Sequence, residues 1–137
     1  WFCYATCVES LQKEMDFLLA LLKDCGLTPD KVPMGVFLDV EDDSYRPFRH
    51  WPGLKVVNEM CHAFCDGISA AGYKAGIYSS ASWFGRDSYI QGYEFRKHTV
   101  WVAEWNPTCT VEEANIWQFT DHLLVNGKVY DGNYILG

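Results

Sequence analysis

The sequence has little positive charge. Eleven Lys and Arg stand against eighteen Asp and Glu in 137 residues, which gives a formal net charge of −7, and the basic residues form no cluster. Proteins that bind nucleic acids carry a basic patch or stripe that neutralises phosphates. The sequence therefore excludes nucleic acid as the main partner.

Long apolar runs are also missing. No stretch approaches the roughly 20 apolar residues that a membrane-spanning helix requires, so no membrane partner is expected. No signal peptide is visible, and the first residue is Trp1, not Met. We expect the sequence to begin partway into a longer protein.

Two kinds of catalytic motif are absent. No Gly-x-Ser-x-Gly turn surrounds the serines at positions 79–82, which argues against a serine hydrolase. Cys61 and Cys65 lie four apart on an expected helix, but no second Cys or His pair stands at ligand spacing. We therefore expect no metal and no organic cofactor. The six cysteines are expected to be buried free thiols: Cys3, Cys7, Cys25, Cys61, Cys65 and Cys109.

Apolar and aromatic residues are plentiful. Hydrophobic residues make up 49% of the chain, which is enough for one globular domain over residues 1–137. Six Trp, eight Tyr and eight Phe exceed what a core of this size needs. Aromatic residues fill cores and also line sugar-binding clefts, so composition alone leaves both interpretations open.

The order of elements predicts an α/β fold. Apolar spacing predicts helices over residues 8–24 and 54–71, and apolar runs predict strands between and after them. Strands that alternate with helices indicate crossover connections, a largely parallel sheet and a barrel-like α/β fold. The expected strands are 1–5, 34–40, 74–78, 99–103, 116–119 and 129–135, with a hairpin turn at Asn126-Gly127.

A pair of carboxylates marks the end of one buried strand. Successive strand residues face opposite ways, so Phe37, Asp39 and Glu41 share one face, and the residues between them pack under helices. Active sites of α/β barrels lie at the carboxyl ends of the strands. Two neighbouring carboxylates should raise one pKa, as the cleavage of a glycosidic bond requires. Strand-end acids can also simply meet solvent or cap a helix.

Five segments in order carry a resemblance to a known family. They are Leu38–Glu41 with Asp-x-Glu, residues 72–80 with Gly-Tyr-x-x-Gly-Ile-Tyr, Trp101–Ala103, Trp117–Thr120, and Asp131–Asn133 with Asp-x-Asn. Together they resemble the family 25 glycoside hydrolases, the Chalaropsis-type lysozymes or N-acetylmuramidases found as bacterial autolysins and phage endolysins. The similarity covers nearly the whole sequence.

The resemblance implies a TIM-barrel-like fold that is incomplete at its N-terminus. The family's opening strand carries an Asp-x-Ser-x-(Trp/Phe)-Gln-Gly type motif that nothing in this sequence matches. The first two strands are therefore expected to be absent. The strand edges left exposed could lead to self-association.

The resemblance also implies an activity and a set of site residues. The family's chemistry is hydrolysis of the β-1,4 bond between N-acetylmuramic acid and N-acetylglucosamine in peptidoglycan, at the bacterial cell wall, by a secreted or phage-delivered enzyme. Glu41 would be the general acid, Asp39 would orient the substrate's N-acetyl group, and Asp131 would add an acidic wall. The residues expected to hold the sugars are Tyr78, Trp105, Gln118 and, more weakly, Tyr4.

Several alternatives remain open from the residues themselves. The chain could be a non-catalytic glycan-binding module that keeps the aromatic cleft. Asp131 could anchor a turn at Gly132, and Trp101 is expected to pack in the core. An amidase on a similar barrel would normally need a metal-ligand set, which is absent.

Overall fold

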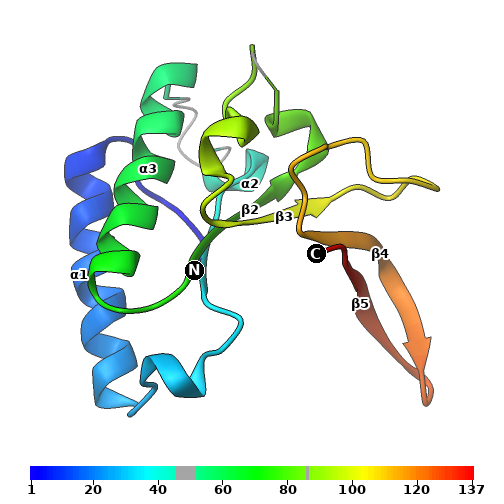
Figure 1. Cartoon of the computed structure of the whole chain (residues 1–137), viewed down its shortest axis with the longest axis horizontal. Coiled ribbons are helices and arrows are strands. Elements are labelled where there is room, and N and C mark those ends of the chain that lie inside the picture. Colours follow the sequence, from blue (N-terminus) through cyan, green and yellow to red (C-terminus); the bar gives the residue numbers. More distant parts are fainter. Residues whose placement is uncertain (46–51, 86) are drawn as a thin grey trace.

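The chain folds into helices on one side of a curled five-stranded sheet (Figure 1). The computed structural model describes residues 1–45, 52–85 and 87–137, so part of the predicted loop after residue 42 lies outside the described residues. The helices are α1 (Val8–Asp24), α2 (Asp42–Tyr45) and α3 (Leu54–Ala70), with 3-10 turns η1 (Pro29–Lys31), η3 (Ala81–Trp83) and η4 (Gly92–Phe95). The strands are β1 (Val36–Asp39), β2 (Ala75–Ser80), β3 (Thr99–Ala103), β4 (Ile116–Val125) and β5 (Lys128–Ile135).

The sheet has the order β1-β2-β3-β4-β5, with the first four strands parallel. Helix α3 makes the crossover between β1 and β2, and 3-10 turns take its place between β2 and β3. Strand β5 returns antiparallel to β4. The predicted mixed α/β, largely parallel architecture is confirmed, and the sheet is a half-barrel in the part of the chain described.

One face of the sheet forms the core with the helices. Leu38, Ile77, Val100 and Val102 are fully buried on this face. Helix α3 packs on β1 and β2, and α1 packs on α3, so the two helices lie side by side (Figure 1). The helix residues buried here recur at three- and four-residue spacing: Leu11, Met15, Leu18 and Leu22 in α1, and Val57, Met60, Phe64 and Ile68 in α3. The predicted alternation along residues 36–40 is confirmed.

The first residues of the chain run beside β1. Phe2 forms a single parallel bridge with Asp39, with the Asp39 N–H donating to the Trp1 carbonyl and the Cys3 N–H donating to the Asp39 carbonyl, each at 2.8 Å. The segment predicted as a strand thus pairs with β1 over a very short length. These bonds fix the backbone of the predicted catalytic carboxylate from its outer edge.

Strands β4 and β5 form a hairpin that points away from the helices (Figure 1). The predicted turn is confirmed: Asn126 and Gly127 have φ of 50° and 76°, the left-handed values that a tight two-residue hairpin turn requires. β4 continues six residues beyond the predicted end at Phe119. Large apolar side chains on the hairpin are exposed: Leu124, Val129, Tyr130, Tyr134 and Ile135.

Two expectations about local structure need correction. Residues 42–45 form the short helix α2, where a polar loop was predicted. The six cysteines are free, and Cys3, Cys61 and Cys65 are buried as expected. Cys109 is only half-buried, and Cys7 and Cys25, which flank α1, are exposed. In the described part of the chain, no group of His, Cys, Asp or Glu could hold a metal ion, and no helix is long and apolar enough to cross a membrane.

Candidate active site

A pocket of about 260 Å³ opens on the concave face of the sheet. Its walls come from β1 and the residue pair at its carboxyl end, from inward-facing residues within β2, β3 and the first part of β4, and from the start of the chain and β5. The lining residues are Trp1, Phe37, Asp39, Glu41, Tyr78, Trp101, Gln118 and Asp131. The structure therefore brings together five of the residues predicted from the sequence: Asp39, Glu41, Tyr78, Gln118 and Asp131.

Asp39 lies in a partly buried environment that perturbs its carboxyl group. Burial raises its pKa to about 7, and a hydrogen bond to Glu41 and repulsion from the Glu41 charge add to the effect. Its buried Oδ1 atom has no hydrogen-bond partner within the described residues. The sequence predicted that one member of the pair would have a raised pKa, and the structure places that property on Asp39, whereas the proton donor was predicted to be Glu41.

Glu41 is held at the start of α2. Its backbone N–H donates to the Ser44 hydroxyl at 3.1 Å, and its carbonyl accepts from the Ser44 N–H at 2.9 Å. The next residue, Asp42, accepts the indole N–H of Trp83 at 3.0 Å. The turn after β1 is thus fixed from both sides, and the Glu41 side chain next to it lines the pocket.

Tyr78 and Gln118 face each other across the pocket. The Tyr78 hydroxyl donates to the Gln118 Oε1 at 3.1 Å, which links β2 to β4 across β3. Burial raises the pKa of Tyr78 to about 12, and the negative charges of Glu41, Asp39 and Asp131 contribute. The Tyr78 hydroxyl is therefore a neutral hydrogen-bond donor at every physiological pH.

Trp101 lies in the pocket, which corrects the expectation that it packs in the core. Its indole N–H donates to the Asn133 Oδ1 at 2.8 Å. Its ring meets Phe37 and Tyr78 edge to face, with ring centroids 5.3 and 5.0 Å away. Trp101 is the register partner of Tyr78, which pairs with Asp39, so the three side chains share a face. Phe37, Trp101, Asn133 and the pocket residue Trp1 were not predicted as site residues, although strand alternation already placed Phe37 beside Asp39.

Asp131 reaches the pocket from an irregular part of the hairpin. Register shifts occur in β4 between Gln118 and Leu123, opposite the segment of β5 that contains Asp131. Such irregularities re-aim side chains locally. Gly132 lies inside β5, where an added Cβ would come within 2.7 Å of the Phe119 ring. The alternative in which Asp131 anchors a turn at Gly132 is therefore wrong, because the turn lies at residues 126 and 127.

Trp105 and Tyr4 do not line this pocket. The Trp105 side chain lies beyond the end of β3 and is 62% exposed. Tyr4 is 54% exposed, and its backbone N–H donates to the Glu14 carboxylate at 3.2 Å. The structure therefore leaves both residues outside the group that surrounds Asp39 and Glu41.

A carboxylate pair with aromatic walls, at the carboxyl end of a parallel strand in a curled α/β sheet, is the kind of site that glycosidases use. The family model for glycosyl hydrolases family 25 matches residues 1–128. The chain belongs to that family, whose enzymes hydrolyse glycans of cell-wall peptidoglycan. No curated protein and no solved structure matches the chain.

Proposed function

We propose that the chain is the catalytic region of an N-acetylmuramidase, which hydrolyses the β-1,4 bond between N-acetylmuramic acid and N-acetylglucosamine. The observation that carries the proposal is the pairing of Asp39 and Glu41 in one pocket beside Tyr78 and Trp101. Family membership supports the glycan substrate. The site of action is then the bacterial cell wall, reached by secretion or phage delivery, and the mechanism below needs no cofactor.

Glu41 is proposed as the general acid. It donates its proton to the glycosidic oxygen as the bond from C1 to that oxygen breaks, while the carbonyl oxygen of the substrate's own N-acetyl group bonds to C1. In the reacting form of the pair the proton lies on Glu41 and Asp39 is ionised, so Asp39 accepts a hydrogen bond from the N-acetyl N–H and stabilises the positive charge that develops on the group. Glu41 then takes a proton from water, which attacks C1 and releases the N-acetyl oxygen. Atoms and charge balance over the two steps.

The other pocket residues would hold the sugar rings. Trp101 offers an aromatic wall whose orientation is fixed by Asn133. Tyr78 and Gln118 bond to each other, which leaves the Tyr78 oxygen as an acceptor and the Gln118 amide N–H groups as donors for the sugars. Asp131 adds a negative wall that favours positive charge near C1. Trp105 and Tyr4 have exposed aromatic rings outside the pocket, and their proposed role is to contact sugars farther along the glycan strand.

The half-barrel is proposed to be part of a TIM-type barrel. In that fold two further strands would lie between the segment that carries Phe2 and strand β5. Without those strands, the free edges and the exposed apolar hairpin side chains Leu124, Val129 and Ile135 would favour self-association.

The proposal is tested by the Glu41→Gln variant. Gln keeps the size of the side chain and cannot donate an acidic proton, so release of reducing ends from peptidoglycan should fall to below a few per cent while glycan binding persists. The matched control is Glu9→Gln, which changes an exposed residue of α1. Loss of binding together with hydrolysis would assign Glu41 to substrate binding. Unchanged hydrolysis would remove it from the acid role.

A further inference from the structure

A second and larger cavity lies apart from the carboxylate pocket. It has a volume of about 790 Å³, within the range of small-ligand sites, and shares no lining residue with the pocket around Asp39. Its walls come from η3 and the turn after it, from residues 91–96, and from the loop at residues 110–113 that follows β3. Nothing in the proposed hydrolytic mechanism uses it.

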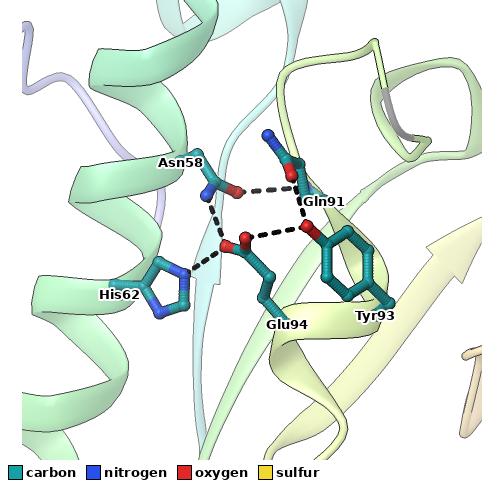
Figure 2. A network of polar contacts seen from close by, with 5 residues as sticks. All are labelled: Asn58, His62, Gln91, Tyr93 and Glu94. Carbon is teal, nitrogen blue, oxygen red and sulfur yellow. Dashed lines mark hydrogen bonds and ion pairs between the residues drawn. The ribbon is translucent and has the colours of Figure 1, made fainter.

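Two polar networks hold the walls of this cavity. In Figure 2 the Glu94 carboxylate accepts hydrogen bonds from Asn58, at 2.7 Å, and from the Tyr93 hydroxyl, at 3.1 Å, and contacts His62 at 2.6 Å. The Gln91 N–H donates to the Asn58 Oδ1 at 3.0 Å. The wall that contains Gln91 and Tyr93 is therefore fastened to α3.

The opposite wall is fixed by Glu104. Its buried carboxylate accepts the N–H of Thr110 at 2.7 Å and the Thr110 hydroxyl at 2.8 Å. The Asn106 amide also donates to it, at 3.0 Å. Walls that are ordered before a ligand arrives reduce the entropy lost on binding, so this cavity is pre-organised.

The lining of the cavity includes a carboxylate with no hydrogen-bond partner among the described residues. The Glu113 side chain is 18% exposed, and within the described residues its one ion-pair contact is the Arg96 Nη2, at 3.7 Å. A Cβ added to Gly92 would lie 3.2 Å from Glu113 Oε2 and 3.6 Å from the Phe84 ring. The Glu113 carboxylate thus lies against the Gly92 backbone, which also has the Phe84 ring beside it, and a cationic group can approach the carboxylate from the cavity that these residues line.

The lining offers three kinds of contact to one ligand. Glu113, with exposed Glu112 beside it, suits an ammonium group, and Arg96 suits a carboxylate. Phe84 and Val111 suit an alkyl stem. A ligand that carries an amine on an alkyl chain next to a carboxylate fits all three.

We propose that this cavity binds the peptide stem of peptidoglycan, with the side-chain amine of its diamino acid on Glu113 and a peptide carboxylate on Arg96. The inference rests on the proposed function, since such peptides are attached to the glycan that the pocket would cleave. The enzyme then binds the peptide of its substrate in this cavity and the sugar chain in the pocket around Asp39.

The test measures binding of the free tripeptide L-Ala-γ-D-Glu-L-Lys to the chain by calorimetry. The same peptide with its lysine amine acetylated should bind about tenfold more weakly, and Glu113→Gln should weaken binding of the unmodified peptide by a similar factor. Arg96→Gln should also weaken it, through the peptide carboxylate. Glu9→Gln is the matched control and should change nothing.

Equal affinity for the acetylated and free peptides would overturn the proposal without any reliance on a folded variant. No binding of the free peptide, or binding that is indifferent to Glu113→Gln in a variant with an unchanged circular dichroism spectrum, would also overturn it. The peptide contains no glycosidic bond, so this result is independent of the hydrolysis assay. Failure of that assay with intact peptide binding would reject the muramidase and keep the cavity.

Discussion

Asp39 and Glu41 leave the same strand end and meet different surroundings. Asp39 is the last residue of β1 and lies between the Trp1–Cys3 segment and β2, whereas Glu41 lies at the start of α2. Burial is the largest cause of the raised pKa of Asp39, which is about 7. Near neutral pH the pair therefore shares one proton over part of the population, as paired carboxylates do.

The raised pKa of Asp39 predicts a pH-dependent stability. The folded state binds the Asp39 proton more tightly than the unfolded chain does, so the free energy of unfolding falls as the pH rises from about 4 to about 7. Asp39→Asn removes this loss. Above pH 7 the variant should be more stable than the parent, on the order of 1–2 kcal/mol after allowance for solvent screening of a partly exposed group.

Denaturant unfolding at several pH values measures this difference. The gap between Asp39→Asn and the parent should close as the pH falls below about 4, where the Asp39 carboxyl is neutral in both states. Exposed Asp24→Asn is the control and should show no such change with pH. A gap that stays constant across the whole range would contradict the assignment of the shared proton to Asp39.

Side-chain direction could be predicted from the sequence only inside strands. Asp39, Tyr78 and Gln118 lie within β1, β2 and β4, where alternation fixes which face a residue occupies. Trp105 lies two residues past the end of β3, and no periodicity applies there. Trp105 was predicted to bind sugar because it follows the Trp101–Ala103 motif, but its side chain is largely exposed to solvent.

At the scale of elements, the close contact between β1, β2 and β3 shapes the pocket. Gly76 of β2 lies between Phe37 and Thr99, and an added Cβ would come within 2.5 Å of both the Phe37 ring and the Thr99 carbonyl oxygen. The absence of a side chain at residue 76 leaves room for the Phe37 ring, which meets Trp101 edge to face. Packing therefore requires the glycine of the Gly-Ile-Tyr motif, which is also part of the family pattern.

Gly76→Ala is predicted to destabilise the fold and to disturb the pocket. The overpacked Cβ should lower the free energy of unfolding by about 1–3 kcal/mol, as measured by thermal or denaturant unfolding. It should also push the Phe37 ring toward Trp101, which tryptophan fluorescence would register. The control is Gly53→Ala, where an added Cβ meets nothing within 4 Å. Equal stability of the two variants would contradict this packing.

The elements themselves followed closely from sequence patterns. Helix α1 and strand β3 have the predicted bounds. Leucines at helical spacing are typical of an amphipathic helix, and a short apolar run is typical of a buried strand. The length of β4 and the irregular pairing opposite Asp131 were not predictable. Both depend on how two strands pair across the hairpin, and local sequence does not encode that register.

For the whole molecule, the polar and apolar residues divide between two faces of one sheet. The face that meets α3 is apolar and buried, and the opposite face carries the carboxylates and aromatic rings of the pocket. The order of helices and strands predicted this division. It could not predict the cavity that contains Glu113, since residues 84, 96 and 113 meet only through the path of two irregular connections.

The measurement that tests the central claim most directly is the identity of the sugar at each new reducing end. Purified peptidoglycan is incubated with the protein, and the products are reduced and analysed by mass spectrometry, with Glu41→Gln as the inactive control. Reduced N-acetylmuramic acid at the new ends is the predicted result. Reduced N-acetylglucosamine, or cleavage within the peptides alone, would contradict the account.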